Sequence, residues 1–215
     1  MVEFHRLILE ENRDLVDRAK NHPLNDLILQ GKLSKEQSHR WFEQGYLLVE
    51  DYGRFLAALV ARAPRNVRTC MLEYMLNVHM ELGLFSEPVG DSGILSEKPR
   101  MSFATHAYVS FLQSAAHVRS FGEGLSACYA LNVSWAEVRS RLLQTKKSPH
   151  AVWDNLAEAW SHDDPSRRIG TIAKCIDRIG EETTDECKRS MHESFRQSIC
   201  YLLRFWDGIV EGADW

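Results

Sequence analysis

The chain has 215 residues, of which 44% are hydrophobic and 26% are charged, and its formal net charge is −4. This length and apolar content suffice for a sizeable core, so we expect a single domain over residues 1–215. Because the chain has no basic excess and no run approaching ~18 apolar residues, we expect neither a nucleic-acid partner nor a membrane partner.

The N-terminal segment and the cysteines indicate a cytoplasmic location. The segment MVEFHRLILEENRDLV is amphipathic and acidic, and it lacks the basic start and the long apolar core of a signal peptide. The five cysteines form no short CxxC motif. This pattern fits reduced thiols better than a disulfide framework or a zinc site.

Helical periodicity dominates the first half of the chain, and no convincing alternating strand pattern is present. A first helix is expected over about 3–20. The sequence SKEQ at 34–37 is a capping box, which predicts the start of a long helix over about 34–63. Another helix is expected over 66–83. Residues 84–102 hold two prolines and two glycines, which favour a long loop.

The second half of the chain continues the helical pattern. Helices are expected over 105–118 and 121–143. The dipeptide DP at 164–165 is typical of an N-cap followed by proline at the first helical position. The sequence TTDE at 183–186 predicts a second capping box, which opens a last helix that ends near Val210. The predicted fold class is therefore all-α, a bundle of seven to eight helices.

Four segments carry a joint resemblance to a known family. They are HPL…QGKL…WFEQGYLLVEDYGRFLAAL from residue 22, HAYVSFLQSAA (106–116), LSACYALNVSWAEV (125–138) and SICYLLRFWDGIV (198–210). Their order and spacing resemble the TenA family, the thiaminase II group of the haem-oxygenase-like fold. The resemblance covers most of the chain. HP, Q-x-Y and the final FWD are moderately specific alone and much stronger in this order.

This resemblance implies an all-α bundle with a pocket between helices. It implies a homo-oligomer, a dimer or a tetramer. It also implies hydrolysis at an aminopyrimidine, either cleavage of thiamin or deamination of an aminomethylpyrimidine in thiamin salvage. That chemistry needs neither a metal nor another cofactor, so the implied partner is a small-molecule substrate.

The resemblance places a nucleophile at Cys128. In ACYALN this residue stands at the family's cysteine position, while Ala127 replaces a proline and Asn132 replaces the tyrosine four residues on. A thiolate that attacks the electron-poor pyrimidine ring divides one difficult displacement into two easier steps. The alternative is that Cys128 is a small buried apolar residue, which is the common environment of a free cysteine.

Aromatic residues would form the walls of the implied pocket. Tyr46 matches the tyrosine of the family's Q-D-Y motif, and Tyr108 matches the tyrosine after the central loop. Flat aromatic walls suit a heteroaromatic ring, and phenols can hydrogen-bond to it. Phe205 of the FW pair would either close this pocket or fill the core, and the core is the favoured place. In the alternative interpretation all three are ordinary core residues.

Two further positions depart from the family pattern and lose polar groups. Gly45 stands where the family has an aspartate that binds the pyrimidine nitrogen and amino group, and Leu202 stands where it has a glutamate proposed for acid–base work. General acid–base help is typically worth ~10²–10⁴ in rate. These losses suggest a second hypothesis, in which a divergent member binds a different, less polar small molecule without thiaminase activity.

Glu50 is the remaining candidate for acid–base work. It follows Tyr46 by four residues, so the two share one helical face. A carboxylate at this position lies about one turn from the glycine that replaces the family's aspartate. The alternative is an ion pair on the surface between Glu50 and Arg54, which is also four residues away.

A third hypothesis is a haem-oxygenase-like di-iron oxidase. Glu50 falls where that branch of the fold has its first glutamate. The other ligand positions do not follow, because Leu84, Asn132 and Arg168 stand where ligands would be required, and only His79 and His162 remain as isolated candidates. A di-iron site needs roughly six protein ligands in register. We therefore expect no metal site.

Overall fold

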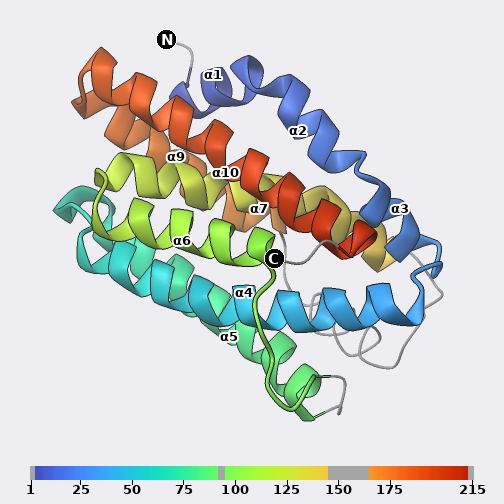
Figure 1. Ribbon diagram of the computed structural model, residues 1–215. Helices are drawn as coiled ribbons and strands as arrows, with labels where there is room; N and C mark the ends of the chain where they lie inside the picture. Colours follow the sequence, from blue (N-terminus) through green and yellow to red (C-terminus); the bar gives the residue numbers. More distant parts are fainter. Residues whose placement is uncertain (1–2, 92–94, 145–164, 213–215) are drawn as a thin grey trace.

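The computed structural model describes residues 3–91, 95–144 and 165–212. These residues form helices joined by turns and short loops, with no strand among them (Figure 1). The helices are α1 (Phe4–Glu11), α2 (Arg13–Lys20), α3 (Pro23–Leu29), α4 (Lys35–Ala61), α5 (Arg65–Asp91), α6 (Phe103–His117), α7 (Phe121–Gln144), α9 (Pro165–Glu182) and α10 (Asp185–Glu211). The all-α fold class is thus confirmed.

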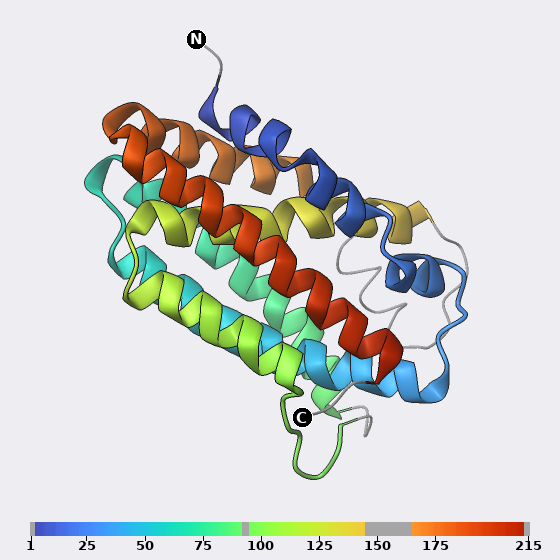
Figure 2. The same cartoon turned by 45° about the horizontal axis from the view of Figure 1, so that its top comes forward.

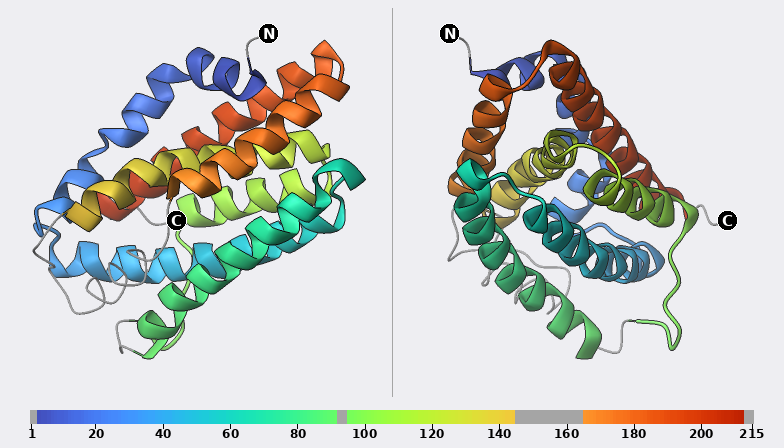
Figure 3. Two further views of the ribbon diagram at one scale, coloured as in Figure 1. Left: turned by 180° about the vertical axis from the view of Figure 1, so that it is seen from behind. Right: turned by 90° about the vertical axis from the view of Figure 1, so that its left-hand side faces the viewer.

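Helix α7 passes through the middle of the bundle, between the α9/α10 pair and the α4/α6 pair (Figure 3). Its residues from Leu125 to Ala130 are all buried, as expected of a helix surrounded on every side. Small side chains permit this close approach. A Cβ on Gly124 would come within 2.7 Å of the Leu59 side chain and 3.0 Å of the Ala115 carbonyl.

Helix α10 runs alongside α7 and closes the other side of the bundle. In Figure 2 it lies between α2 and α3 on one side and α6 on the other. Its C-terminal end is a glycine cap, because Gly212 adopts the left-handed conformation with φ of 76°. The expected end near Val210 is therefore correct to within about one residue, which is the usual uncertainty of helix ends.

The two predicted capping boxes have different outcomes. At the start of α4, Ser34 Oγ accepts from Gln37 N at 3.1 Å and Gln37 Oε1 accepts from Ser34 N at 3.0 Å, so this box is confirmed. At the start of α10 the predicted box is wrong. The N-cap is Thr184, one residue later than expected, and its hydroxyl accepts from Cys187 N at 3.3 Å.

The prediction of one continuous helix over 3–20 is also wrong, because the chain breaks at Asn12. The Asn12 side chain donates to the Ile8 carbonyl at 2.9 Å, and its backbone leaves the helical region with ψ of 19°. A short polar side chain that bonds to nearby backbone competes with the helix in this way. The sequence interpretation also missed α3, where Pro23 occupies the first helical turn after His22.

The predicted loop over 84–102 is wrong in its first part, since α5 continues to Asp91. Glycine and proline lower helix propensity there, but adding turns to a helix that already exists costs less than starting one. The predicted proline start at 164–165 agrees with α9, which begins at Pro165; residue 164 lies outside the described residues. No helix in the described ranges is both long and apolar enough to cross a bilayer.

The N-terminal helix α1 packs against α9 through an aromatic ring on a glycine. Phe4 is buried, and a Cβ on Gly180 would lie only 2.6 Å from a ring carbon of Phe4. The close approach of α1 and α9 therefore depends on the absence of a side chain at Gly180. Gly170, on the same helix, has no atom within 4 Å of the place where its Cβ would be.

Replacing Gly180 with alanine should destabilise the protein by about 1–3 kcal/mol, because the new methyl group must displace the Phe4 ring. Gly170→Ala is the matched control. It should be neutral or stabilise by up to ~1 kcal/mol, since alanine favours helix without a new clash. Urea unfolding of both variants beside wild type measures the difference. Equal stability of the two variants would contradict this packing.

Candidate functional site

Cys128 lies in a buried hydrogen-bonded cluster built by three helices. Its Sγ is 3.2 Å from Tyr52 Oη on α4, and its S–H donates to Tyr74 Oη on α5 at 3.7 Å. The two phenol oxygens are 3.2 Å apart. Asn132, one turn later on α7, donates to Tyr52 Oη at 3.1 Å and to the Cys128 carbonyl at 2.8 Å. We call Tyr52, Tyr74, Cys128 and Asn132 the thiol cluster.

Burial determines the protonation of the thiol cluster. Removal from water disfavours a thiolate and raises the pKa of Cys128 to about 11, against a small opposite effect of its phenol partners. Burial also raises the pKa of Tyr52 and of Tyr74 well above the usual tyrosine value, with the nearby Cys128 adding to the effect. At neutral pH the cluster therefore holds an uncharged thiol and two uncharged phenols.

A second set of aromatic side chains lies further along α7. The Trp135 ring is 6.3 Å from Trp41 on α4 and 5.5 Å from Trp206 on α10, in edge-on contacts. We call Trp41, Trp135 and Trp206 the tryptophan layer. The indole Nε1 of Trp206 is buried without a hydrogen-bond partner. A buried donor with no acceptor is rare in a folded protein and indicates a group that a ligand or a water would satisfy.

Gly45 lies between the thiol cluster and the tryptophan layer. It shares one face of α4 with Trp41, four residues before it, and with Tyr52, seven residues after it. Trp41 belongs to the tryptophan layer and Tyr52 to the thiol cluster. A side chain added at this position would therefore point into the region that separates the two.

Leu202 on α10 also lies between the thiol cluster and the tryptophan layer. Ser198, four residues earlier, donates to the Ala127 carbonyl beside Cys128 at 3.0 Å, and Trp206, four residues later, packs on Trp135. Leu202 itself is fully buried. Gly45, Asn132 and Leu202, which the family pattern singled out, thus lie at one level of the bundle, next to Cys128.

Tyr108 on α6 joins the same region through Ser198. Its Oη lies 3.1 Å from Ser198 Oγ, and its ring stacks on Tyr201 at 6.3 Å between centroids. Burial raises the pKa of Tyr108 above its usual value; the hydrogen bond with Ser198 opposes this shift, and the Cys128 thiol adds a smaller contribution in the same direction as burial. The structure therefore brings Tyr108 close to the thiol cluster.

Other candidate residues lie elsewhere. Tyr46 is partly exposed on a different face of α4 from Tyr52, and Glu50 is exposed one turn after it. Arg54 pairs with Asp51 at 2.9 Å. The ion pair on this surface is therefore formed by Asp51, the residue after Glu50, and not by Glu50 as the alternative interpretation expected. Phe205 is buried in the core. The position of Ala157, where the family has a tyrosine, lies outside the described residues.

Two buried arginines near the thiol cluster were not anticipated from sequence. Arg139 on α7 shares a face with Cys128, and Arg168 lies on α9. Desolvation lowers the pKa of Arg139 to about 10 and lowers that of Arg168, while Tyr74 opposes the shift in both. Asn132, Trp135 and Arg139 follow Cys128 by 4, 7 and 11 residues, and this helical spacing was the signal in the sequence that could have placed Arg139 on the face of α7 that carries Cys128.

Within the described residues, no group of three or more histidine, cysteine, aspartate or glutamate side chains could hold a metal ion. His79 is exposed on α5. His162, a possible ligand in the di-iron hypothesis, and the side chain of Glu81 lie outside the described parts of the chain.

The model of the TENA/THI-4/PQQC family matches residues 9–212. The chain belongs to this family. A TenA homologue from Pyrococcus furiosus has a TM-score of 0.85 at 24% identity, covering 96% of this chain and 99% of that chain. A candidate TenA-like thiaminase from Sulfolobus solfataricus has a TM-score of 0.77 at 18% identity, covering 100% and 99%. No curated protein matches the chain.

The haem-oxygenase-like architecture is also confirmed. Haem oxygenase-1 from the cyanobacterium Synechocystis sp. PCC 6803, solved with haem, has a TM-score of 0.63 at 11% identity, with 98% of this chain and 96% of that chain covered. At this identity the likeness concerns the fold alone.

The HP and FWD signatures of this TenA-family chain meet in space. His22 Nδ1 accepts from Leu24 N at 3.2 Å, which leaves Nε2 to donate its hydrogen to Asp207 Oδ1 at 3.1 Å. The His22 ring also packs on Trp206 at 5.4 Å. These residues therefore join α3 to α10 and hold the tryptophan layer in place.

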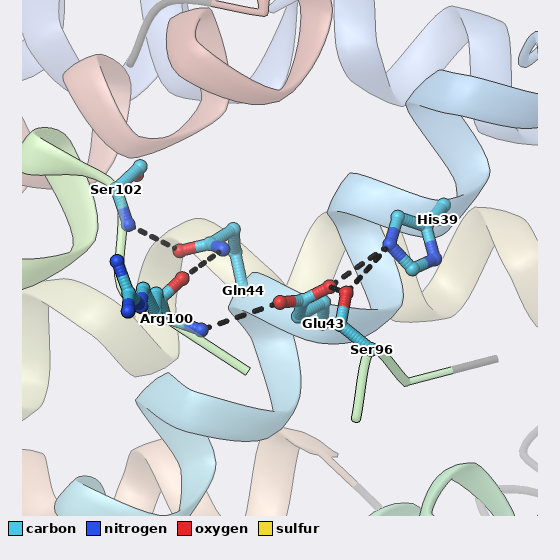
Figure 4. Close-up of polar contacts among 6 residues, drawn as sticks. All are labelled: His39, Glu43, Gln44, Ser96, Arg100 and Ser102. Carbon is cyan, nitrogen blue, oxygen red and sulfur yellow. Dashed lines mark hydrogen bonds and ion pairs between the residues drawn. The ribbon is translucent and has the colours of Figure 1, made fainter. Parts of the chain in front are cut away.

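The glutamine of the Q-x-Y signature has a similar positioning role (Figure 4). Gln44 accepts from Ser102 N at 2.9 Å and donates to the Arg100 carbonyl at 2.9 Å. Its neighbour Glu43 accepts from Ser96 Oγ at 2.8 Å and pairs with His39 at 2.9 Å. These bonds fix the segment that leads into α6, the helix that carries Tyr108.

Raising the pH from 8 to 11 should lower the free energy of unfolding. The folded-state pKa of Cys128 is raised from 9 to about 11, so its neutral form contributes stability that is present below pH 9 and is lost as the pH rises through 11. This amounts to about 3 kcal/mol. Urea unfolding at a series of pH values measures the slope.

Cys128→Ser should show a shallower decline over this range, because serine does not titrate there. Cys200→Ser is the control, since Cys200 is an exposed cysteine and its removal should leave the decline unchanged. A wild-type free energy that stays constant between pH 9 and 11 would contradict the buried neutral thiol.

Proposed function

We propose that this protein is a TenA-like hydrolase that exchanges a C–N bond for a C–O bond on an aminopyrimidine, with Cys128 as the nucleophile. The substrate would be thiamin or its degradation product aminomethylpyrimidine. The observation that carries this proposal is the thiol cluster, which joins the Cys128 thiol to two phenols. Family membership and the similarity to a candidate thiaminase support it.

The thiol cluster supplies a route for the proton of Cys128. Because the thiol is protonated at neutral pH, its proton must leave as sulfur adds to the pyrimidine ring carbon. Tyr74 Oη already accepts the S–H, and Tyr52 Oη lies 3.2 Å beyond it. A proton can therefore pass along the phenols without a buried free thiolate.

The remaining steps follow from the balance of atoms. Addition of sulfur to the ring allows the amine to leave from the neighbouring methylene group with a proton. Water then takes its place, and sulfur leaves the ring as the thiol is restored. The net reaction for aminomethylpyrimidine consumes one water and releases hydroxymethylpyrimidine and ammonia. In this scheme Tyr108 and the tryptophan layer bound the ring on either side, as flat apolar walls.

A second candidate function is binding of a less polar ligand without turnover. It is favoured by the fully buried Leu202 and by the glycine at position 45, since neither can bind a ring nitrogen or protonate a leaving group. The pKa of Cys128, about 11, also leaves little thiolate at neutral pH. In either case we propose a cytoplasmic homo-oligomer that needs no metal.

Release of ammonia and hydroxymethylpyrimidine from 4-amino-5-aminomethyl-2-methylpyrimidine tests the hydrolase. Cys128→Ala should abolish turnover, and Tyr52→Phe should reduce kcat by about 10²-fold through loss of one proton-transfer partner. The matched control is Cys187→Ala, which removes an exposed thiol and should retain full activity.

Gly45→Asp separates the two candidate functions. A carboxylate at this level can bind the ring nitrogen and amino group, so it should raise kcat/KM for the aminopyrimidine about 10-fold or more. Turnover that survives in Cys128→Ala would refute the assignment of Cys128 as the nucleophile. A folded wild type that binds a ligand in calorimetry, without ammonia release even in Gly45→Asp, would favour the binding protein.

A further inference from the structure

Two other cysteines meet at the contact between α5 and α9. The Sγ atoms of Cys70 and Cys175 are 3.0 Å apart, although the residues are separated by 105 positions in the chain. Cys175 is buried and Cys70 is partly exposed. Cys70 is also held near α9 by its contact with the Thr171 carbonyl at 3.7 Å, one turn before Cys175.

We propose that Cys70 and Cys175 form a reversible disulfide that ties α5 to α9 when the protein encounters a hydroperoxide. An S–S bond is about 2.05 Å long, so the two sulfur atoms need to approach by only about 1 Å. The helices that carry them already pack against each other. Bond formation therefore requires adjustment of two side chains and no rearrangement of the bundle.

The chemistry proceeds from the exposed sulfur to the buried one. A hydroperoxide oxidises the Cys70 thiol to a sulfenic acid and is itself reduced to an alcohol or water. The Cys175 sulfur then attacks the Cys70 sulfur, the S–S bond forms, and the hydroxyl leaves as water with the Cys175 proton. Burial and the Cys70 contact raise the pKa of Cys175, so it acts as the resolving thiol and not as the first target.

The other three cysteines do not compete for this bond. Cys128 is enclosed in the thiol cluster, while Cys187 and Cys200 are exposed on α10. Because exposed thiols form disulfides between molecules, they would confuse a test in the wild type. A parent variant with Cys187→Ser and Cys200→Ser removes this complication and leaves the proposed pair intact.

The disulfide would have two physical consequences. It would close a loop of more than 100 residues, which restricts the unfolded chain strongly. It would also fix α5 against α9 one helical turn before Tyr74, a member of the thiol cluster. The crosslink does not itself depend on the hydrolase, because no residue of that reaction takes part in it.

The test oxidises the parent variant with hydrogen peroxide, blocks remaining thiols with N-ethylmaleimide, and maps crosslinked peptides by mass spectrometry. The expected product is one peptide pair that contains Cys70 and Cys175, two hydrogens lighter than the reduced pair. Its rate of formation should not depend on protein concentration. The melting temperature should rise by about 5–15 °C and should return after treatment with dithiothreitol.

Cys70→Ser in the parent background should abolish both the crosslink and the shift in melting temperature. Because serine at the buried position 175 can impair folding, Cys175→Ala is the second variant, and its circular dichroism spectrum establishes that it is folded. A fully oxidised parent in which Cys70 carries sulfinic acid with Cys175 still free would overturn the proposal. So would a crosslink that involves Cys128 instead.

Discussion

The burial of the central turns of α7, residues 124–130, on all sides is the constraint on which the rest of the structure depends. A helix in this position contacts neighbours in every direction, so its side chains must be small where other helices approach. Gly124 allows α4 and α6 to come close, and Ala127 accepts the Ser198 hydroxyl from α10. Cys128 takes its place in this run as a small side chain, and it is the nucleophile in the proposed reaction.

The same burial explains the electrostatics of the site. Polar groups removed from water must find partners inside the protein. Cys128, Tyr52, Tyr74 and Asn132 satisfy one another, and desolvation keeps the thiol and phenols uncharged. Next to the thiol, surroundings of this kind favour an uncharged, flat ring. In the proposed reaction, proton transfer along the phenols would therefore take the place of a preformed thiolate.

Contacts far from Cys128 place the elements that surround it. The His22–Asp207 hydrogen bond joins α3 to α10 next to Trp206, and Gln44 holds the segment before α6. Residues that serve as family signatures thus act here by positioning helices. This division explains how the chain keeps the TenA architecture while the polar groups at positions 45 and 202 are absent.

The sequence by itself determined the helical class, the family and most helix boundaries, because these follow from local periodicity, capping residues and ordered motifs. It also identified Cys128 and three positions about one helical turn away from it along the bundle, Asn132, Gly45 and Leu202. The rest of the site depended on tertiary structure. Tyr52, Tyr74 and the Cys70–Cys175 contact join helices that are far apart in the chain. Local sequence patterns carry no record of which faces of distant helices meet, and that packing alone decides which groups lose contact with water.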